Sequence, residues 1–255
     1  MNELPFSLER SILIHARKET VFSYFTDSAR FATWWGAGSE IEPRVGGAVK
    51  IRYPEGTRAG GEVLEIDPPR LIAFTYGYEG EGKLIPPGGS KVTVTVEEGE
   101  DGTLVTLKHD VATEKVRNEH VQGWRYQMAV FSNVVSALQH AGVTEKVDHL
   151  FRAWAEPDVE ARRKLLESCV TADVDFRDPY SATSGLEDLI PHITAAQFFM
   201  PGVVLARDGD LKQCQGTAVA RWTATKAGNV VAKGMNVYEL APDGRIRSVV
   251  GLWGE

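Results

Sequence analysis

The feature that most constrains the fold is a long run of apolar residues at helical spacing between residues 114 and 142. These residues recur at alternating steps of three and four, at Val121, Trp124, Met128, Phe131, Val135 and Leu138. Because this spacing places the apolar side chains on one face of a helix, we expect one long amphipathic helix, with Gly142 as its stop. Such a helix must bury its apolar face, so we expect it to lie across a sheet.

The residues before this helix supply that sheet. Five runs of alternating or β-branched residues are separated by turns rich in glycine and proline, at residues 40–54, 59–69, 70–79, 90–98 and 103–111. Residues 6–16 predict one more strand, and residues 18–27 a short helix. Glycine and proline supply the turn conformations that other residues resist, so this half is predicted to be a meandering antiparallel sheet.

A second series of elements begins directly after Gly142. Residues 144–170 predict two helices with a break at Glu156-Pro157, and residues 186–199 predict a further helix. Five runs that alternate like strands surround this last helix, at residues 172–179, 202–211, 215–225, 229–240 and 244–253. The charge-rich segment 160–167 is typical of a solvated helix face. We therefore predict an α+β chain of two domains, residues 1–143 and 144–255.

Composition excludes several classes of function. The formal net charge is -7, which argues against sequence-independent binding to the phosphate backbone of nucleic acids. No segment reaches the roughly 18 apolar residues of a membrane span, and the first residues lack the layout of a secretory signal. The two cysteines, Cys169 and Cys214, lack metal-type spacing and fit a reducing compartment. We expect a cytoplasmic protein with no metal, no cofactor, and neither nucleic acid nor membrane as partner.

Six motifs of the first half match one family in order. They are "ILIHARKETVFSYFTD", "FATWWG", "IEPRVGGAVKI", "GGEVLEIDPPRLIAFTY", "GTLVTLKH" and "HVQGWRYQM". By these residues the first half resembles the activator of Hsp90 ATPase homologue 1-like family of the START-like (SRPBCC) superfamily. The resemblance implies a helix-grip fold, in which an antiparallel sheet wraps a long C-terminal helix and leaves a cavity for apolar ligands.

Two long motifs of the second half match another family. They are "RAWAEPDVEARRKLLESCVTADVDFRDPYSATSGLEDLIPHI" and "KGMNVYELAPDGRIRSVVGLWGE". By these residues the second half resembles the SnoaL-like or ketosteroid-isomerase-like group of the NTF2-like superfamily. The resemblance implies an α+β cone, in which a bent sheet wraps helices around an apolar pocket, and a homodimer through the sheet.

The Asp178-Pro179 step is the candidate catalytic feature. In ketosteroid isomerases the matching aspartate is the general base, so the resemblance implies that role for Asp178. The donor aspartate of those enzymes corresponds to Asn236, which can donate a hydrogen bond, but their donor tyrosine corresponds to Leu150, which cannot. This departure weakens steroid isomerase chemistry in particular. Alternatively, Asp178 accepts backbone N–H bonds and starts a turn, as Asp-Pro steps commonly do.

Large aromatic residues are the candidate ligand contacts. Strand alternation over residues 173–178 places Phe176 on the same face as Asp178, in the apolar company that a pocket-facing carboxylate needs. Such rings suit the walls of an apolar cavity, and they also bury well in an ordinary core. The candidates are Trp35 and Trp124 in the first half, and Trp154, Phe176, Trp222, Tyr238 and Trp253 in the second.

Three functions compete for this chain. The leading hypothesis is the binding of a small apolar organic ligand in one or both domain cavities. The second is cofactor-independent isomerase or polyketide-cyclase-type proton transfer in the second half, with Asp178 as base and Asn236 as polarising donor. The third, an interaction protein that contacts a chaperone, has the least support. Whether the chain is an enzyme therefore stays open.

Overall fold

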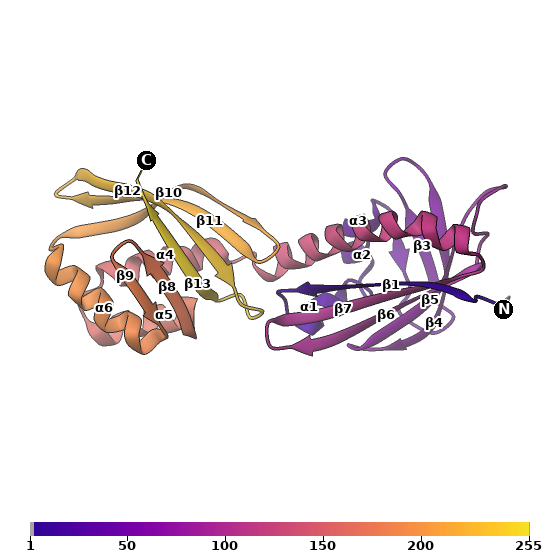
Figure 1. Ribbon diagram of the computed structural model, residues 1–255, viewed down its shortest axis with the longest axis horizontal. Helices are drawn as coiled ribbons and strands as arrows, with labels where there is room; N and C mark the ends of the chain where they lie inside the picture. The colour runs from indigo at the N-terminus through magenta and orange to yellow at the C-terminus, as the bar shows by residue number, and fades with distance from the viewer. Residues whose placement is uncertain (1–2, 255) are drawn as a thin grey trace. The chain divides into compact units, whose positions relative to one another are not determined.

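The computed structural model describes residues 3–254 of the chain. These residues form two compact units, which divide between Ser136 and Ala137. Each unit combines helices with one sheet, so the predicted α+β class is confirmed. Unit 1 holds the elements up to the long helix that ends at Gln139, whose last residues cross the boundary, and unit 2 holds the elements that follow (Figure 1).

Unit 1 is built on a seven-stranded antiparallel sheet in the order β1-β7-β6-β5-β4-β3-β2. The expected strand at residues 40–54 is divided in two, because Gly46 turns the chain at a φ of 75°, which residues with a side chain rarely adopt. The elements of this unit before its long helix are β1 (Phe6–Ile14), α1 (Lys18–Ser23), α2 (Ser28–Trp35), β2 (Glu40–Ile41), β3 (Ala48–Arg52), β4 (Arg58–Asp67), β5 (Leu71–Tyr78), β6 (Ser90–Gly99) and β7 (Gly102–Val111).

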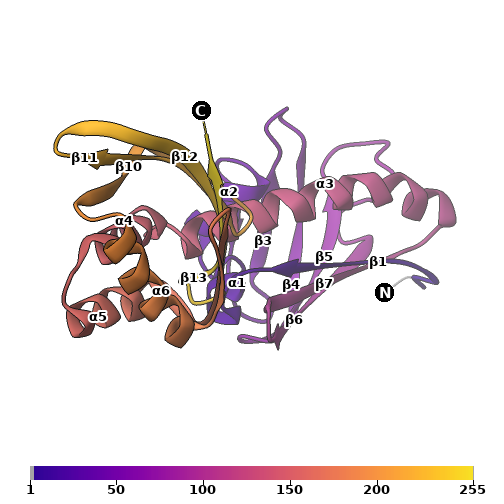
Figure 2. The same cartoon turned by 60° about the vertical axis from the view of Figure 1, so that its left-hand side comes forward.

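The long helix α3 (Glu114–Gln139) covers one face of this sheet (Figure 1, Figure 2). Its buried residues Trp124, Met128 and Phe131 share one core with side chains from the strands. The apolar face is narrower than its spacing predicted, because Val121 and Leu138 are each 42% exposed. The helix also ends before Gly142, which instead precedes the next helix with a φ of −87°.

Unit 2 is built on a six-stranded sheet in the order β10-β11-β12-β13-β8-β9. The pairing of β13 with β8 is parallel, and the other pairs are antiparallel. The three helices share a core with one face of the sheet. The elements are α4 (Val143–Ala155), α5 (Val159–Cys169), β8 (Val170–Asp178), β9 (Ser181–Ser184), α6 (Leu186–Phe199), β10 (Val203–Cys214), β11 (Thr217–Lys226), β12 (Asn229–Leu240) and β13 (Ile246–Trp253).

A buried arginine forms hydrogen bonds both to the break between α4 and α5 and to α6. The side chain of Arg162 is fully buried, so the prediction of a solvated helix face at 160–167 is wrong at this residue. Its guanidinium donates to the backbone oxygen of Glu156 at 2.8 and 3.0 Å, to Thr194 Oγ1 at 2.6 Å and to Gln197 Oε1 at 2.7 Å. Because Thr194 and Gln197 belong to α6, this side chain links that helix to the α4–α5 break.

Candidate functional site

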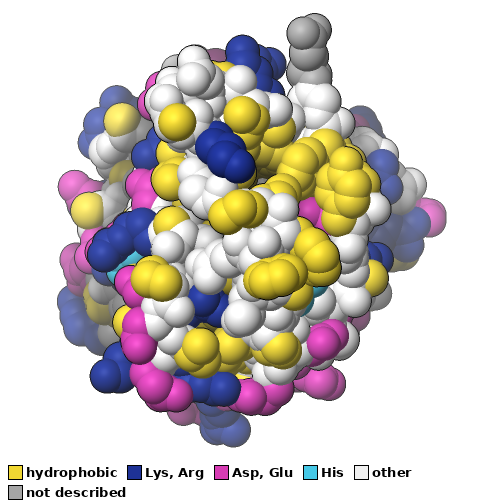
Figure 3. Space-filling view, turned by 90° about the vertical axis from the view of Figure 1, so that its left-hand side faces the viewer, with side chains coloured by type: hydrophobic (Ala, Val, Ile, Leu, Met, Phe, Trp, Pro, Cys, Tyr) yellow, Lys and Arg dark blue, Asp and Glu magenta, His cyan; other side chains and the backbone are white. Residues whose placement is uncertain are grey.

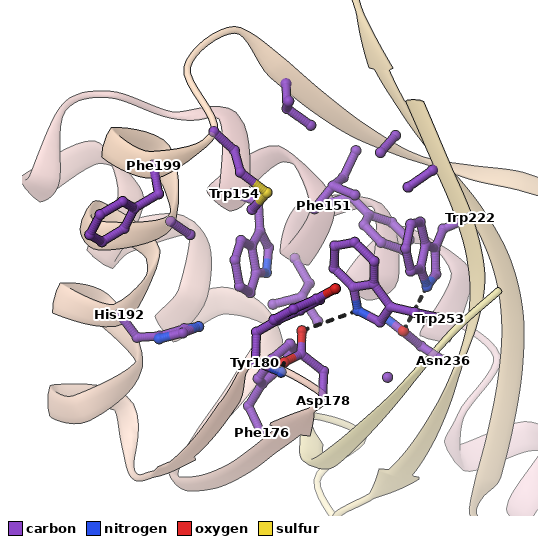
Figure 4. Close-up of a pocket in the computed structure, with 18 of the residues that line it drawn as sticks. Phe151, Trp154, Phe176, Asp178, Tyr180, His192, Phe199, Trp222, Asn236 and Trp253 are labelled. Carbon is purple, nitrogen blue, oxygen red and sulfur yellow. Dashed lines mark hydrogen bonds between the residues drawn. The ribbon is translucent and has the colours of Figure 1, made fainter. Parts of the chain in front are cut away.

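Unit 2 encloses a cavity of about 710 Å³ between α4, α6 and the concave side of its sheet (Figure 4). The wall is mostly aromatic and aliphatic, with few polar groups. Of the residues that the sequence singled out in this half, six line the cavity, namely Trp154, Phe176, Asp178, Trp222, Asn236 and Trp253. Leu150, at the position of the isomerase tyrosine, lines it as well.

The alternation of side chains along β8 places Asp178 on the face of the strand that lines this cavity. Val174 and Phe176 are buried and Asp178 is half-buried, whereas Asp173 and Arg177 on the opposite face are exposed. This pattern follows from the two-residue period of a strand, as the sequence predicted.

Gly251 on β13 leaves open the space beside Asp178. A Cβ at this position would lie 3.1 Å from Asp178 Cβ and 3.3 Å from Asn236 Oδ1. Asp178 and Asn236 therefore both lie next to Gly251, and all three residues line the cavity.

Three neutral donors bind the Asp178 carboxylate. Oδ1 accepts hydrogen bonds from the backbone N–H of Tyr180 at 2.8 Å and from Ser181 Oγ at 2.5 Å. Oδ2 accepts one bond from Trp253 Nε1 at 3.3 Å. Asp178 thus holds the turn between β8 and β9 with one oxygen, while its second oxygen lies among the rings of the cavity (Figure 4).

The amide of Asn236 is oriented by its neighbours. Trp222 Nε1 lies 2.9 Å from Asn236 Oδ1, and because an indole nitrogen only donates, this atom must be the amide oxygen. The amide nitrogen then donates to the hydroxyl of Tyr238 at 3.2 Å. Burial raises the pKa of Tyr238, which keeps this hydroxyl protonated. Tyr238 is fully buried and supports Asn236 from outside the set of residues that line the cavity.

The aromatic rings pack into two groups around Asp178. Trp253 contacts Trp222 with ring centroids 5.2 Å apart, and it contacts Tyr180 at 4.9 Å, both edge to face. Trp154 and Phe176 pack at 5.3 Å in the second group. The carboxylate lies between these groups in Figure 4.

Several residues of the site were missed from the sequence. Tyr180 follows the Asp-Pro step and stands at the cavity with 75% of its surface exposed. His192 and Phe199 come from α6, where a spacing of seven residues places them on one face of the helix. This spacing was the available signal for α6, whereas Tyr180 lies in a turn that has no periodicity.

The open side of the cavity is apolar. Phe199 is 78% exposed and Val231 53% exposed, and both line the cavity. Figure 3 shows hydrophobic side chains gathered on a face of the molecule that belongs to unit 2. A ligand can therefore enter through a hydrophobic opening.

Unit 1 has a second, more open cavity of about 920 Å³ beside α3. Trp35 and Trp124, the two candidates in this half, both line it, as do Tyr53, Tyr76 and Tyr78. The Tyr53 and Tyr76 hydroxyls lie 2.7 Å apart. Burial raises the pKa of both tyrosines, so this polar corner stays uncharged.

A chain of hydrogen bonds fixes the ring of Trp124. Trp124 Nε1 donates to His109 Nδ1 at 3.0 Å, so the proton of a neutral His109 ring sits on Nε2. This Nε2 lies 2.8 Å from Ser90 Oγ, which in turn donates to the backbone oxygen of Tyr76 at 2.8 Å. Burial lowers the pKa of His109 to about 3, which agrees with the neutral ring.

No group of three or more His, Cys, Asp or Glu residues within 3–254 is arranged to hold a metal ion. No helix within the same range is long and apolar enough to cross a membrane.

The comparisons with known proteins divide the chain in the same way. The activator of Hsp90 ATPase homolog 1-like protein family matches residues 15–136, and the SnoaL-like domain family matches residues 147–249. No curated protein matches the chain.

Similar solved structures each cover about half of the chain. A SnoaL-like family protein from Agrobacterium tumefaciens is 27% identical over 46% of this chain and 99% of its own, with a TM-score of 0.42. An AHSA1-like protein from Rhizobium etli is 26% identical over 51% of this chain and 82% of its own, with a TM-score of 0.41. The Aha1 protein from Colwellia psychrerythraea, solved as a dimer, is 19% identical over 48% and 90%, with a TM-score of 0.42.

The family matches agree with the motifs of each half and with the α+β architecture of each unit. Residues 15–136 therefore match the activator of Hsp90 ATPase homolog 1-like family, and residues 147–249 match the SnoaL-like domain family.

Proposed function

We propose that this protein binds small, largely apolar organic molecules, in the cavity of unit 2 and separately in that of unit 1. The observation that carries the proposal is the unit 2 cavity, whose 710 Å³ lies in the usual range for small-molecule sites. Its wall combines several aromatic rings with two convergent polar side chains, Asp178 and Asn236. This composition is typical of sites that bury most of a ligand and orient it with a few polar contacts.

A pair of matched variants tests the proposal. Ala196 on α6 lines the cavity, and a tryptophan there would occupy part of it. Ala206 on β10 is exposed, so Ala206→Trp adds the same side chain away from the cavity. We expect Ala196→Trp to weaken binding of Nile red, a neutral dye that fluoresces in apolar sites, by at least about tenfold, or about 1.4 kcal/mol.

The control variant Ala206→Trp should bind the dye as the unaltered protein does. Equal dye affinity for the two variants, each shown by circular dichroism to be folded, would place the dye elsewhere. That result would remove the unit 2 cavity from the proposal.

A second candidate is cofactor-free proton transfer, of the isomerase or cyclase type, in unit 2. It is supported by the position of Asp178 and Asn236 on either side of Gly251 in one aromatic cavity. Asp178 would accept the proton through Oδ2, the oxygen with a single donor. Asn236 would polarise a carbonyl only through the second hydrogen of its amide group, because the amide already donates to Tyr238.

Deuterium exchange tests this candidate. β-Tetralone carries an acidic C–H beside its carbonyl, and protein-catalysed exchange in deuterated water can be followed by NMR. We expect Asp178→Asn to abolish the catalysed exchange, while Asp173→Asn, on the exposed face of the same strand, retains it. Equal catalysed rates in both variants would exclude Asp178 as the base.

A further inference from the structure

The charge of the unit 2 cavity is unbalanced. Its ionisable side chains are Asp178, Tyr180 and His192, and no lysine or arginine of the described residues lines it. Asp178 is in none of the ion pairs found between described residues. One carboxylate thus faces a mostly aromatic space without a cationic partner in its wall.

The nearby arginines do not supply that partner. Arg177 precedes Asp178 on β8, and its side chain is exposed on the opposite face of the strand. Arg207 follows Leu205 on the cavity side of β10, but it pairs with Asp148, with Nε 2.9 Å from the Asp148 carboxylate. Arg177 is therefore turned away from the cavity, and the charge of Arg207 is neutralised by Asp148.

The hydrogen bonds of Asp178 leave one oxygen open to a ligand. Oδ1 is occupied by the two short bonds from Tyr180 and Ser181. Oδ2 has only the bond from Trp253, at 3.3 Å, which is longer than the usual range for N–H···O bonds. A stronger donor within the cavity can bind this oxygen without breaking the turn that Oδ1 holds.

The rings around the carboxylate favour the same kind of donor. The faces of tryptophan, tyrosine and phenylalanine rings are electron-rich and attract cations within about 6 Å. Trp253, Tyr180 and Phe176 surround Asp178 in Figure 4, and Trp154 and Trp222 extend the aromatic wall on both sides. These rings would contact the methylene or methyl groups next to a positive nitrogen.

We propose that the unit 2 cavity selects an organic amine, with its positively charged nitrogen at Asp178 and an apolar body in the aromatic space. This inference rests on the proposed binding function and names its ligand class. A neutral ligand of the same shape would leave the carboxylate without a counter-charge in a partly dehydrated site, which is unfavourable. The net charge of -7 also raises the concentration of organic cations near the protein.

Three probes of one shape test the inference by isothermal titration calorimetry. Phenylbutylamine is cationic, phenylbutanol is neutral and phenylbutyrate is anionic at neutral pH, and all three carry a phenyl ring on a chain of four carbon atoms. We expect the amine to bind at least about tenfold more tightly than the alcohol, or about 1.4 kcal/mol, and the carboxylate to bind most weakly.

Matched variants assign the preference to one residue. Asp178→Asn keeps an oxygen for the bonds from Tyr180 and Ser181, and we expect it to remove the preference for the amine over the alcohol. Circular dichroism checks that this variant is folded. Asp173→Asn removes the same charge from the exposed face of β8 and should keep the full preference.

The outcomes separate this inference from the proposed function. If the alcohol binds the unaltered protein as tightly as the amine, or if Asp173→Asn lowers the preference as much as Asp178→Asn, the amine assignment is wrong and the binding function stands. If none of the three probes binds, and Nile red does not bind either, both proposals fail.

Discussion

The fully buried guanidinium of Arg162 gives the most direct test of how unit 2 is held together. Replacing it by methionine keeps most of the volume and removes every donor. Gln197 Oε1 and Thr194 Oγ1 on α6 would then lose their charged donor, and the backbone oxygen of Glu156 would keep only its bond from Gln197 Nε2 at 3.0 Å. The variant therefore weakens the link between α6 and the α4–α5 break, which would be left with the bonds that Gln197 donates.

The magnitude follows from two opposing effects. Hydrogen bonds to a charged group contribute about 1.5–3 kcal/mol each, and buried acceptors that lose their donor are costly. Methionine in turn avoids the dehydration of a buried charge, which offsets part of the loss. We expect Arg162→Met to lower the free energy of unfolding of unit 2 by about 3 kcal/mol.

The neighbouring arginine provides the control. Arg163 pairs with Glu187, whose side chain is 78% exposed, and solvent-exposed ion pairs contribute at most about 1 kcal/mol. Arg163→Met in the full chain should therefore change stability by less than about 1 kcal/mol.

Urea unfolding followed by circular dichroism measures both variants, and hydrogen exchange of residues 186–199 shows whether α6 is the element that loosens. Equal stability of the two variants, or unchanged exchange in α6 of Arg162→Met, would refute the role assigned to the buried guanidinium.

Three further predictions concern the buried residues His109 and Cys169 and the cavity residue Gly251. Because burial lowers the pKa of His109 from 6.5 to about 3, this residue gains a proton between these values only in the unfolded chain, and its contribution to stability should fall by about 1.4 kcal/mol per pH unit as the pH is lowered through this window. Urea unfolding at several pH values should show a smaller slope for His109→Gln, and an identical slope would contradict the neutral ring. Burial raises the pKa of the Cys169 thiol to about 12, so Ellman's reagent should titrate the exposed Cys214 in the folded protein and both cysteines only in denaturant; rapid reaction of both in the folded state would contradict this. Gly251→Val should weaken binding of Nile red by at least about tenfold, because its Cβ alone meets two cavity side chains at 3.1 and 3.3 Å, and unchanged affinity in a folded variant would show that this part of the cavity is not used.

Local patterns predicted most of the secondary structure and part of the site. The helix at residues 186–199, the break at Glu156-Pro157 and the face of β8 that carries Phe176 and Asp178 all follow from periodicity and turn chemistry, which depend only on neighbours in the sequence. The family motifs identified both folds, and the candidate rings of each half, apart from Tyr238, line a cavity.

What the sequence could not predict depends on contacts between distant segments. Arg162 sits in a charge-rich helix and is buried only because acceptors from α6, 28 to 35 positions later, surround it. The orientation of the Asn236 amide depends on Trp222 from the neighbouring strand. The ion pair of Arg207 likewise joins it to Asp148, 59 positions away in the sequence.

The central place of β13 in the unit 2 sheet has a consequence for synthesis on the ribosome. This strand is the last of its unit to be made, yet it lies between β12 and β8 and joins the two parts of the sheet. Until it emerges, the nascent chain exposes two unpaired strand edges, and Trp253 and Gly251 are absent from the cavity. Unit 1 can fold completely during this time, because domains made earlier fold as units. Before β13 emerges, these unpaired edges can pair with strands of other nascent chains on the same messenger RNA. The risk of aggregation is therefore highest in this interval.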